Sequence, residues 1–311
     1  MPYFVFKNIY FFAKKKMEEN NRIRIEKQTL PTGVLETAYP YLDSGNQLHQ
    51  FNLYKMDGAE DTGELPLIID IHGGGWICGD KDLNSNFNYH LVLKGYNVSS
   101  LSYRTIDHCT IREQIKDIFD YFHFLKDNGG RLGISFHKVV LTGDSAGGQL
   151  ALLVYCINQN MKLQKLFSVA HVDMDVKCLI LNHSVCYIDE AGSFRNNPFL
   201  SRLVSGSGLQ RMIYGKGFLK EELYLNTFNP TRYIFRETAM APVLLITSKG
   251  DTAFSYQTIK LYDYLTELGK DCELYLEESV NAKHVFNIAY PDSAEGKKCN
   301  DYIHEYISAR L

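Results

Sequence analysis

One serine of the sequence has the surroundings of a catalytic nucleophile. Ser145 lies in VVLTGDSAGGQLALL, where Gly143, Asp144, Ala146 and Gly147 give the pattern Gly-x-Ser-x-Gly. At a sharp turn from a strand into a helix, such a serine exposes its hydroxyl, and its small neighbours let the backbone segments approach closely. The alternative is a glycine-rich turn in which Ser145 only caps the helix. A base, an acid and hydrogen-bond donors elsewhere in the chain are needed to decide between the two.

A glycine-rich loop can supply the hydrogen-bond donors. The sequence HGGGW, residues 72–76, follows the apolar run LPLIIDI. Glycines after a buried strand present backbone N–H groups without obstruction, which suits the negative oxygen of a tetrahedral intermediate. We expect the amides of Gly73 and Gly74 to be donors, with that of Ala146 as the third. A phosphate-binding loop is the alternative, but the Gly-x-Gly-x-x-Gly spacing and the lysine-serine pair of a P-loop are absent.

The other residues of this loop are expected to support it. His72 lies within the donor segment, so we predict that it holds the loop by hydrogen bonding and is not the base. Gly75 extends the unobstructed backbone, and Trp76 is equally consistent with the core and with a pocket wall.

The acid and the base are predicted later in the chain. Asp251 directly follows the apolar run PVLLITS, and His284 follows CELYLE by a short loop. Catalytic groups collect at the carboxyl ends of strands in an open parallel sheet, and the order Ser, Asp, His is that of a hydrolase nucleophile elbow. Taken alone, Asp251 could be a turn or helix-cap residue and His284 a structural histidine. Four elements that each follow a strand nevertheless agree on one site.

These residues together predict acyl transfer. Ser145 would attack an ester carbonyl while His284 removes its proton, and Asp251 would fix the imidazole tautomer and stabilise its charge. This mechanism needs no cofactor. No metal is expected either, because no cluster of histidine, cysteine and acidic residues has ligand spacing.

The elements that must position these groups are predicted from hydrophobic periodicity. Apolar runs predict strands at 65–72, 96–103, 138–143, 177–183, 242–248 and 272–277, and helical spacing predicts helices near 85–94, 111–130, 146–160, 255–268 and 294–309. Alternation of continuously apolar strands with helices predicts an α/β fold with a mostly parallel sheet flanked by helices. Two earlier extended segments around Ser44 to Asn46 predict an antiparallel hairpin.

Two segments do not fit the alternation. Residues 1–30 predict an amphipathic helix, and residues 184–237 form a connection too long to lack structure in a compact domain. We expect one domain over residues 1–311, with these two segments forming a helical cap. Acyl and alcohol specificity should depend on cap aromatics, among them Phe194, Phe199, Tyr214 and Phe218.

Composition excludes several classes of function. The net charge of −3 gives no electrostatic reason to expect a nucleic-acid partner, and no stretch reaches the length of apolar residues that a membrane span needs. Seven cysteines without a Cys-x-x-Cys pair favour free thiols in a reducing compartment over a disulfide framework. The N-terminal apolar run lacks the order of a signal peptide. We therefore expect a cytoplasmic protein.

The motifs together resemble a known family. HGGGW, GDSAGG, the strand end SLSYR, the late Gly-Asp and KHVF are similar to the hormone-sensitive-lipase-like branch of the α/β-hydrolase superfamily, over roughly residues 60–311. The form HGGGWICGDK is most similar to bacterial acetyl esterases and carboxylesterases. This resemblance implies an eight-stranded sheet, a cap from the N-terminus and from the segment after the sixth strand, and a homodimer as one possible assembly. The chain departs from the family pattern at Asp251-Thr252-Ala253 and at Tyr103 to Asp107.

The predicted function is that of a carboxylesterase for short-chain acyl esters, including acetyl esters of sugars or xenobiotics. The substrate partner would be a small-molecule ester. An amidase of the arylformamidase type is the alternative enzyme, because its loops are similar to HGG-x-W. A non-catalytic ligand-binding α/β-hydrolase homologue is the alternative of a different class.

Overall fold

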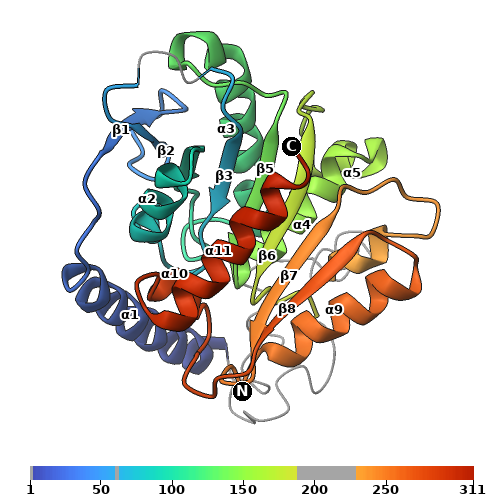
Figure 1. The fold of residues 1–311 in the computed structure, drawn as a ribbon. Coiled ribbons are helices and arrows are strands. Elements are labelled where there is room, and N and C mark those ends of the chain that lie inside the picture. The colour runs from blue at the N-terminus through green and yellow to red at the C-terminus, as the bar shows by residue number, and fades with distance from the viewer. Residues whose placement is uncertain (1–2, 60–62, 188–228) are drawn as a thin grey trace.

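The fold is built on one eight-stranded sheet. The computed structural model describes residues 3–59, 63–187 and 229–311 (Figure 1). The strands, in chain order, are β1 (Val34–Pro40), β2 (Gln50–Met56), β3 (Leu67–Ile71), β4 (Asn97–Leu101), β5 (Val139–Asp144), β6 (Val176–Asn182), β7 (Val243–Ser248) and β8 (Cys272–Glu277). Their order across the sheet is β1-β2-β4-β3-β5-β6-β7-β8.

The six strands from β3 to β8 are parallel to one another. The predicted hairpin of β1 and β2 is antiparallel and joins this sheet through an antiparallel pairing of β2 with β4. In the parallel part, Ile71 at the end of β3 is level with Gly143 of β5, and Asp144 is level with Asn182 of β6. The segments that follow these strands therefore leave the same edge of the sheet side by side.

Helices cover both faces of the sheet, as the continuously apolar strands require. In chain order they are α1 (Tyr3–Glu26), α2 (Ser85–Leu93), α3 (Ile111–Leu132), α4 (Ala146–Asn158), α5 (Met161–Phe167), α9 (Ser255–Glu267), α10 (Phe286–Ala289) and α11 (Ala294–Ser308), with a short 3₁₀ helix, η3, at Pro230–Tyr233. Side chains of α3, α4, α5 and α9 belong to one buried cluster, and those of α2, α10 and α11 belong to a second cluster on the opposite face.

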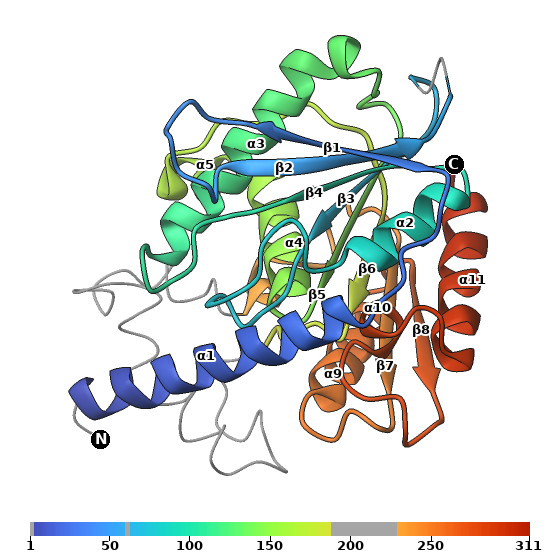
Figure 2. The same cartoon turned by 90° about the vertical axis from the view of Figure 1, so that its left-hand side faces the viewer.

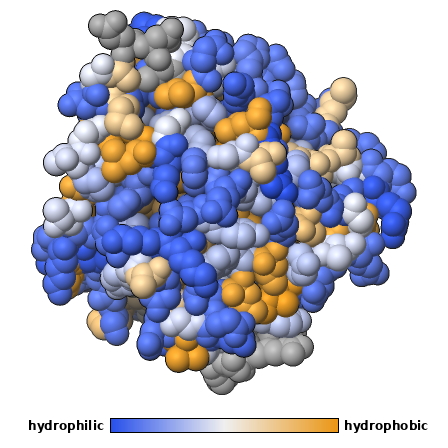
Figure 3. Space-filling model, viewed as in Figure 1, coloured by the Kyte–Doolittle hydropathy of each residue, from blue (hydrophilic) through white to orange (hydrophobic). Residues whose placement is uncertain are grey.

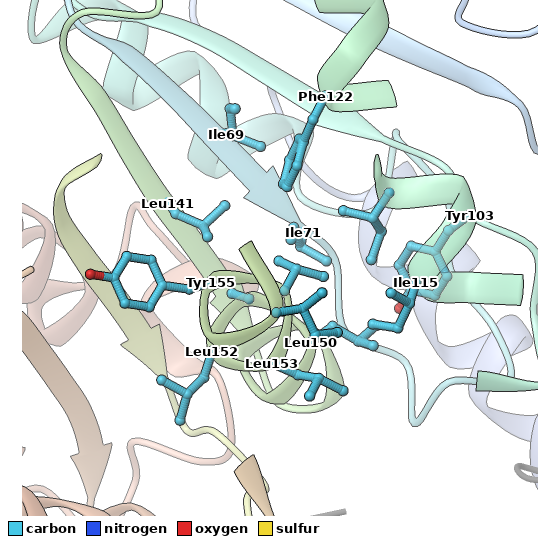
Figure 4. Close-up of a cluster of buried hydrophobic side chains, with 14 of the residues drawn as sticks. Ile69, Ile71, Tyr103, Ile115, Phe122, Leu141, Leu150, Leu152, Leu153 and Tyr155 are labelled. Carbon is cyan, nitrogen blue, oxygen red and sulfur yellow. The ribbon is translucent and has the colours of Figure 1, made fainter. Parts of the chain in front are cut away.

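The first cluster is centred on α4, the helix that follows Ser145. Every residue of α4 is buried, which explains why its sequence is apolar on all sides. Figure 4 shows Leu150 and Leu153 of this helix beside Ile71 of β3 and Ile115 of α3. The helix after the serine is thus fixed on the sheet by packing over its full length.

Helix α1 lies outside these two layers and crosses the carboxyl edge of the parallel strands (Figure 2). Tyr10 and Met17 attach it to the first hydrophobic cluster, and Gln28, just beyond its end, donates a hydrogen bond of 2.8 Å to the carbonyl of Ala289. The first predicted cap segment is therefore helical, as expected. In the second, residues 188–228 lie outside the described residues, and with them Phe194, Phe199, Tyr214 and Phe218.

Several boundaries differ from the predictions. Helix α3 was expected to stop at Gly129-Gly130 but continues to Leu132, where Gly133 in the left-handed conformation ends it. Gly129 instead packs closely against the backbone of Ile134. Helices α5 and α10 were not predicted, because seven and four residues give too little periodicity to recognise.

The surface carries no extended apolar face in the view of Figure 3, where hydrophilic residues separate smaller hydrophobic patches. None of the helices among the described residues combines the length and the hydropathy needed to cross a membrane.

Candidate active site

Ser145 occupies a strained turn between β5 and α4. Its φ of 53° and ψ of −115° lie outside the regions that non-glycine residues prefer, so neighbouring packing must hold it there. A side chain on Gly147 would overlap the carbonyl oxygen of Ile71, and one on Gly143 would overlap that of Gly147. Both glycines of the Gly-x-Ser-x-Gly pattern are therefore needed for the close approach of β3, β5 and α4.

Ser145, His284 and Asp251 form one continuous chain of hydrogen bonds. The Oγ atom of Ser145 is 2.9 Å from Nε2 of His284, and Nδ1 of His284 is 2.7 Å from Oδ2 of Asp251. With Nδ1 protonated and donating to the carboxylate, Nε2 is free to accept the proton of the serine hydroxyl. The three residues predicted from separate parts of the chain are thus brought together by the fold.

The acid is buried and remains ionised. Burial alone would raise the pKa of Asp251, but the hydrogen bond and charge of His284, with smaller contributions that include the amide of Phe254, outweigh it and lower the pKa. The amide of Phe254 donates to Oδ1 at 3.1 Å, so both carboxylate oxygens have donors. A negative charge is consequently available beside His284 when the imidazole is protonated.

The loops that carry Asp251 and His284 are locked to each other. The hydroxyl of Ser248 donates to the carbonyl of Ala282 at 2.7 Å, and a side chain on Gly250 would overlap the same carbonyl oxygen. The segment after β7 and the segment after β8 are therefore held against each other.

One of the oxyanion donors predicted in the glycine loop, the amide of Gly73, has another acceptor. The amide of Gly73 donates to Oδ1 of Asp144 at 2.8 Å and is not free to bind an oxyanion. Among the described residues, the amides of Gly74 and Gly75 have no such acceptor, and both glycines have positive φ, 96° and 61°. The donors that remain beside Ser145 are Gly74, Gly75 and, at the start of α4, Ala146.

The rest of the loop is held by buried polar contacts. The hydroxyl of Tyr103 donates to the carbonyl of His72 at 2.8 Å, and the two rings stack at 4.3 Å. The indole N–H of Trp76 donates to Oε1 of Gln149 in α4 at 3.1 Å. His72 is fully buried, and burial lowers its pKa, so it supports the loop as a neutral ring.

Two buried carboxyl groups lie beneath the loop. Asn84 donates its amide both to Asp144, at 2.9 Å, and to Asp70, at 3.1 Å, and Asn88 and Ser100 also donate to Asp70. Burial, aided by the charge of Asp144, raises the pKa of Asp70 to about 7. The Asp in LIIDI was visible in the sequence as the one acidic residue of an otherwise apolar strand, but its role there was not recognised.

A second histidine also packs against the site. His183 follows β6, its ring lies 5.4 Å from that of His284, and its φ of 48° is unusual for a non-glycine residue. Burial, with the nearby charge of His284, lowers the pKa of His183 to about 3. His183 is therefore a neutral ring that packs against His284 of the triad.

The serine opens into a cavity of about 510 Å³. Its lining includes the glycine loop and six other residues: Ser145, Val185, Phe254, His284, Ile288 and Tyr290. Helix α1 contributes six further residues: Tyr10, Ala13, Met17, Asn20, Asn21 and Arg24. The predicted N-terminal cap segment thus reaches the site, although the sequence did not show which of its residues would do so.

This fold and site define an α/β hydrolase of the esterase-like type. A family model, BD-FAE, matches residues 52–265, more than half of the chain. The chain therefore belongs to the BD-FAE family.

Solved structures of esterases are similar over nearly the whole chain. Esterase B from Lactobacillus rhamnosis is 26% identical, with a TM-score of 0.90, and the match covers 99% of this chain and 95% of that one. The hyperthermophilic esterase of the archaeon Pyrobaculum calidifontis, 19% identical with a TM-score of 0.70 over 96% and 94% of the two chains, shares the fold.

Curated relatives match over shorter segments. Lipase 2 of a Moraxella species is 37% identical over 96 residues, which are 30% of this chain and 22% of that protein. Esterase LipI of Mycobacterium tuberculosis is 28% identical over 103 residues, 33% of this chain and 32% of that protein. The matched part thus spans a third or less of these relatives.

Proposed function

We propose that the protein is a carboxylesterase that cleaves short-chain acyl esters through an acyl-enzyme on Ser145. The observation that carries this proposal is the hydrogen-bond chain from Asp251 through His284 to Ser145. His284 would take the hydroxyl proton as Ser145 attacks the carbonyl carbon, and would then return it to the leaving alcohol. In the second half of the reaction, water would attack the acyl carbonyl while His284 takes a proton from it. His284 would then return the proton to Oγ of Ser145 as the carboxylic acid leaves.

The amides of Gly74, Gly75 and Ala146 would stabilise the oxyanion of each tetrahedral intermediate. Asp144 has an indirect role in this proposal, because it holds the Gly73 amide and thereby the course of the loop. Loss of one oxyanion donor in other hydrolases costs about 3 kcal/mol of barrier.

The lining of the cavity supports binding of an apolar acyl group. Tyr10, Ala13, Met17, Trp76 and Phe254 give it an apolar part beside the serine. A solved structure of esterase B is described as inhibited with a C4-C4 tributyrin phosphonate, and that protein is 26% identical to this chain. Small-molecule esters, acetyl esters of sugars among them, are the proposed substrates.

Hydrolysis of para-nitrophenyl esters of increasing chain length tests the proposal. We expect the highest kcat/KM at acetate or butyrate and a steep fall toward long chains. Ser145→Ala should lower kcat by at least about 10³-fold, and a fluorophosphonate probe should label Ser145 in the wild-type protein, as located by mass spectrometry. Unchanged ester hydrolysis in Ser145→Ala would overturn the proposal, and faster turnover of N-formylkynurenine than of phenyl acetate would favour an amidase instead.

We also propose a cytoplasmic location, supported by seven cysteines that are all free thiols. The homodimer expected from the family resemblance is tested by light scattering of the purified protein.

A further inference from the structure

Arg24 is a charged residue of the active-site cavity that the proposed reaction does not use. Its half-buried side chain extends from the last turn of α1 into the cavity that contains Ser145. Among the described residues its hydrogen bonding is limited to one contact, from Nη2 to the carbonyl of Leu83 at 3.1 Å, and no described carboxylate lies within ion-pair distance. A guanidinium carries five N–H donors in a fixed fork, so most of its donor capacity remains available.

Burial of this cation without a paired anion is costly unless something compensates for it. Burial lowers the pKa of Arg24, and the charge of Asp144 opposes this only in part. Asp144 is the one carboxylate among the described lining residues, and its Oδ1 is occupied by Gly73 and Asn84. Among the described residues, Arg24 therefore forms no ion pair with Asp144, and its guanidinium lines the cavity without a paired acid.

The spacing along α1 places Arg24 at a distance from the reacting atoms. Met17 lies against the oxyanion loop, since a side chain on Gly75 would be in van der Waals contact, 3.9 Å, with its terminal methyl carbon. Arg24 is seven residues further along, about 10 Å on a helix that rises 1.5 Å per residue. Asn20 and Asn21 lie between them on the cavity side. Helix α1 thus presents an apolar half near the serine and a polar, cationic half beyond it.

We propose that Arg24 is a specificity-determining residue that binds a carboxylate on the acid or alcohol part of the ester, several bonds from the carbonyl that Ser145 attacks. This inference rests on the proposed esterase function and names its substrate class: esters that carry a second, ionised carboxyl group. Asn20 and Asn21 would add neutral amide donors beside the guanidinium. Lys283, an exposed residue of the same lining, would add a second positive charge at the rim.

Matched pairs of charged and neutral esters test this assignment. The pairs are para-acetoxybenzoate with its methyl ester, and the para-nitrophenyl monoester of glutaric acid with para-nitrophenyl pentanoate. Arg24→Gln removes the charge but keeps an amide that can donate to the Leu83 carbonyl. We expect it to lower the kcat/KM ratio of charged to neutral ester about 10- to 100-fold in at least one pair, as for loss of a charge-assisted hydrogen bond. Arg24→Lys should restore part of the ratio, because it keeps the charge without the fork.

Arg22→Gln is the control. Arg22 lies on the same helix but pairs with Glu19 and Glu26 on the exposed side, so its loss changes the net charge equally and should leave the ratio unaltered. An equal fall for charged and neutral esters in Arg24→Gln would overturn the proposal and assign Arg24 to anchoring α1.

Binding without turnover separates this inference from the proposed function. In the Ser145→Ala protein, para-hydroxybenzoate should bind at least about 10-fold more tightly than its methyl ester, and Arg24→Gln should abolish the difference. Equal binding of the two would refute the role of Arg24. Wild-type protein that cleaves none of the four esters would refute the esterase function instead.

Discussion

The buried carboxyl of Asp70 should make the stability of the protein fall as the pH rises. Its pKa in the folded protein, about 7, is above the ordinary value of 3.8, so the folded state binds this proton more tightly than the unfolded state. The contribution to the free energy of unfolding therefore decreases from about pH 4 to about pH 8 and is nearly constant above that. A difference of about 3 in pKa, at 1.36 kcal/mol for each, corresponds to about 4 kcal/mol in total, of which about 2.5 kcal/mol falls between pH 5 and pH 8.

Asp70→Asn isolates this contribution, because asparagine has a similar shape and does not titrate. Urea unfolding of both proteins at several values between pH 5 and pH 8 gives the difference in free energy of unfolding at each pH. We expect wild type minus variant to fall by about 2.5 kcal/mol over this range. Asp173→Asn, which removes an exposed carboxylate, is the control and should give a nearly constant difference. A constant difference for Asp70→Asn as well, or one that rises with pH, would refute the reasoning.

Two further predictions concern the site. His183 has a pKa of about 3 in the folded protein, below the ordinary value of 6.5, so its contribution to the free energy of unfolding is lost as the pH falls. Relative to His183→Gln, the free energy of unfolding of the wild type should decrease by about 2 kcal/mol between pH 8 and pH 5, as measured by urea unfolding. A difference that does not depend on pH would contradict this. Gly74→Ala should strongly reduce both the folded yield and kcat, because its Cβ would overlap the carbonyl of Cys78. The Cβ of Gly75→Ala would meet no atom closer than 3.9 Å, so this variant should lose only about 1 kcal/mol of folding stability, from its positive φ. Equal thermal stability of the two variants would count against this geometry.

The elements of the sheet could be predicted from the sequence because their signals are local. Short apolar runs predicted β3 to β8, and the all-apolar α4 predicted the helix after the serine. Strands β3, β4, β5 and β7 are buried along their whole length, whereas β8, at the edge of the sheet, is only partly buried. The end of α3 could not be predicted, because a glycine pair usually stops a helix and only packing against Ile134 shows why Gly129 does not.

Within the site, the roles that depend on chain order could be predicted, and those that depend on contacts across the sheet could not. Ser145, Asp251 and His284 each follow a strand end, which places them at one edge. The Gly73 amide was assigned to the oxyanion because the loop alone shows no competitor for it. Its acceptor, Asp144, lies 71 residues away, and the contact depends on the register of β3 with β5.

The hydrogen bond between Ser248 and Ala282, which joins the segments after β7 and β8, affects when activity arises during synthesis. Chains are made from the N-terminus. The nucleophile and the oxyanion loop are synthesised well before Ala282, whose carbonyl holds the acid and base loops together. Until that residue has docked, Ser145 lacks a positioned base and acid, so a growing chain that ends before it should have no esterase activity. Activity would then arise in a single late step and report completed folding of the C-terminal part of the sheet.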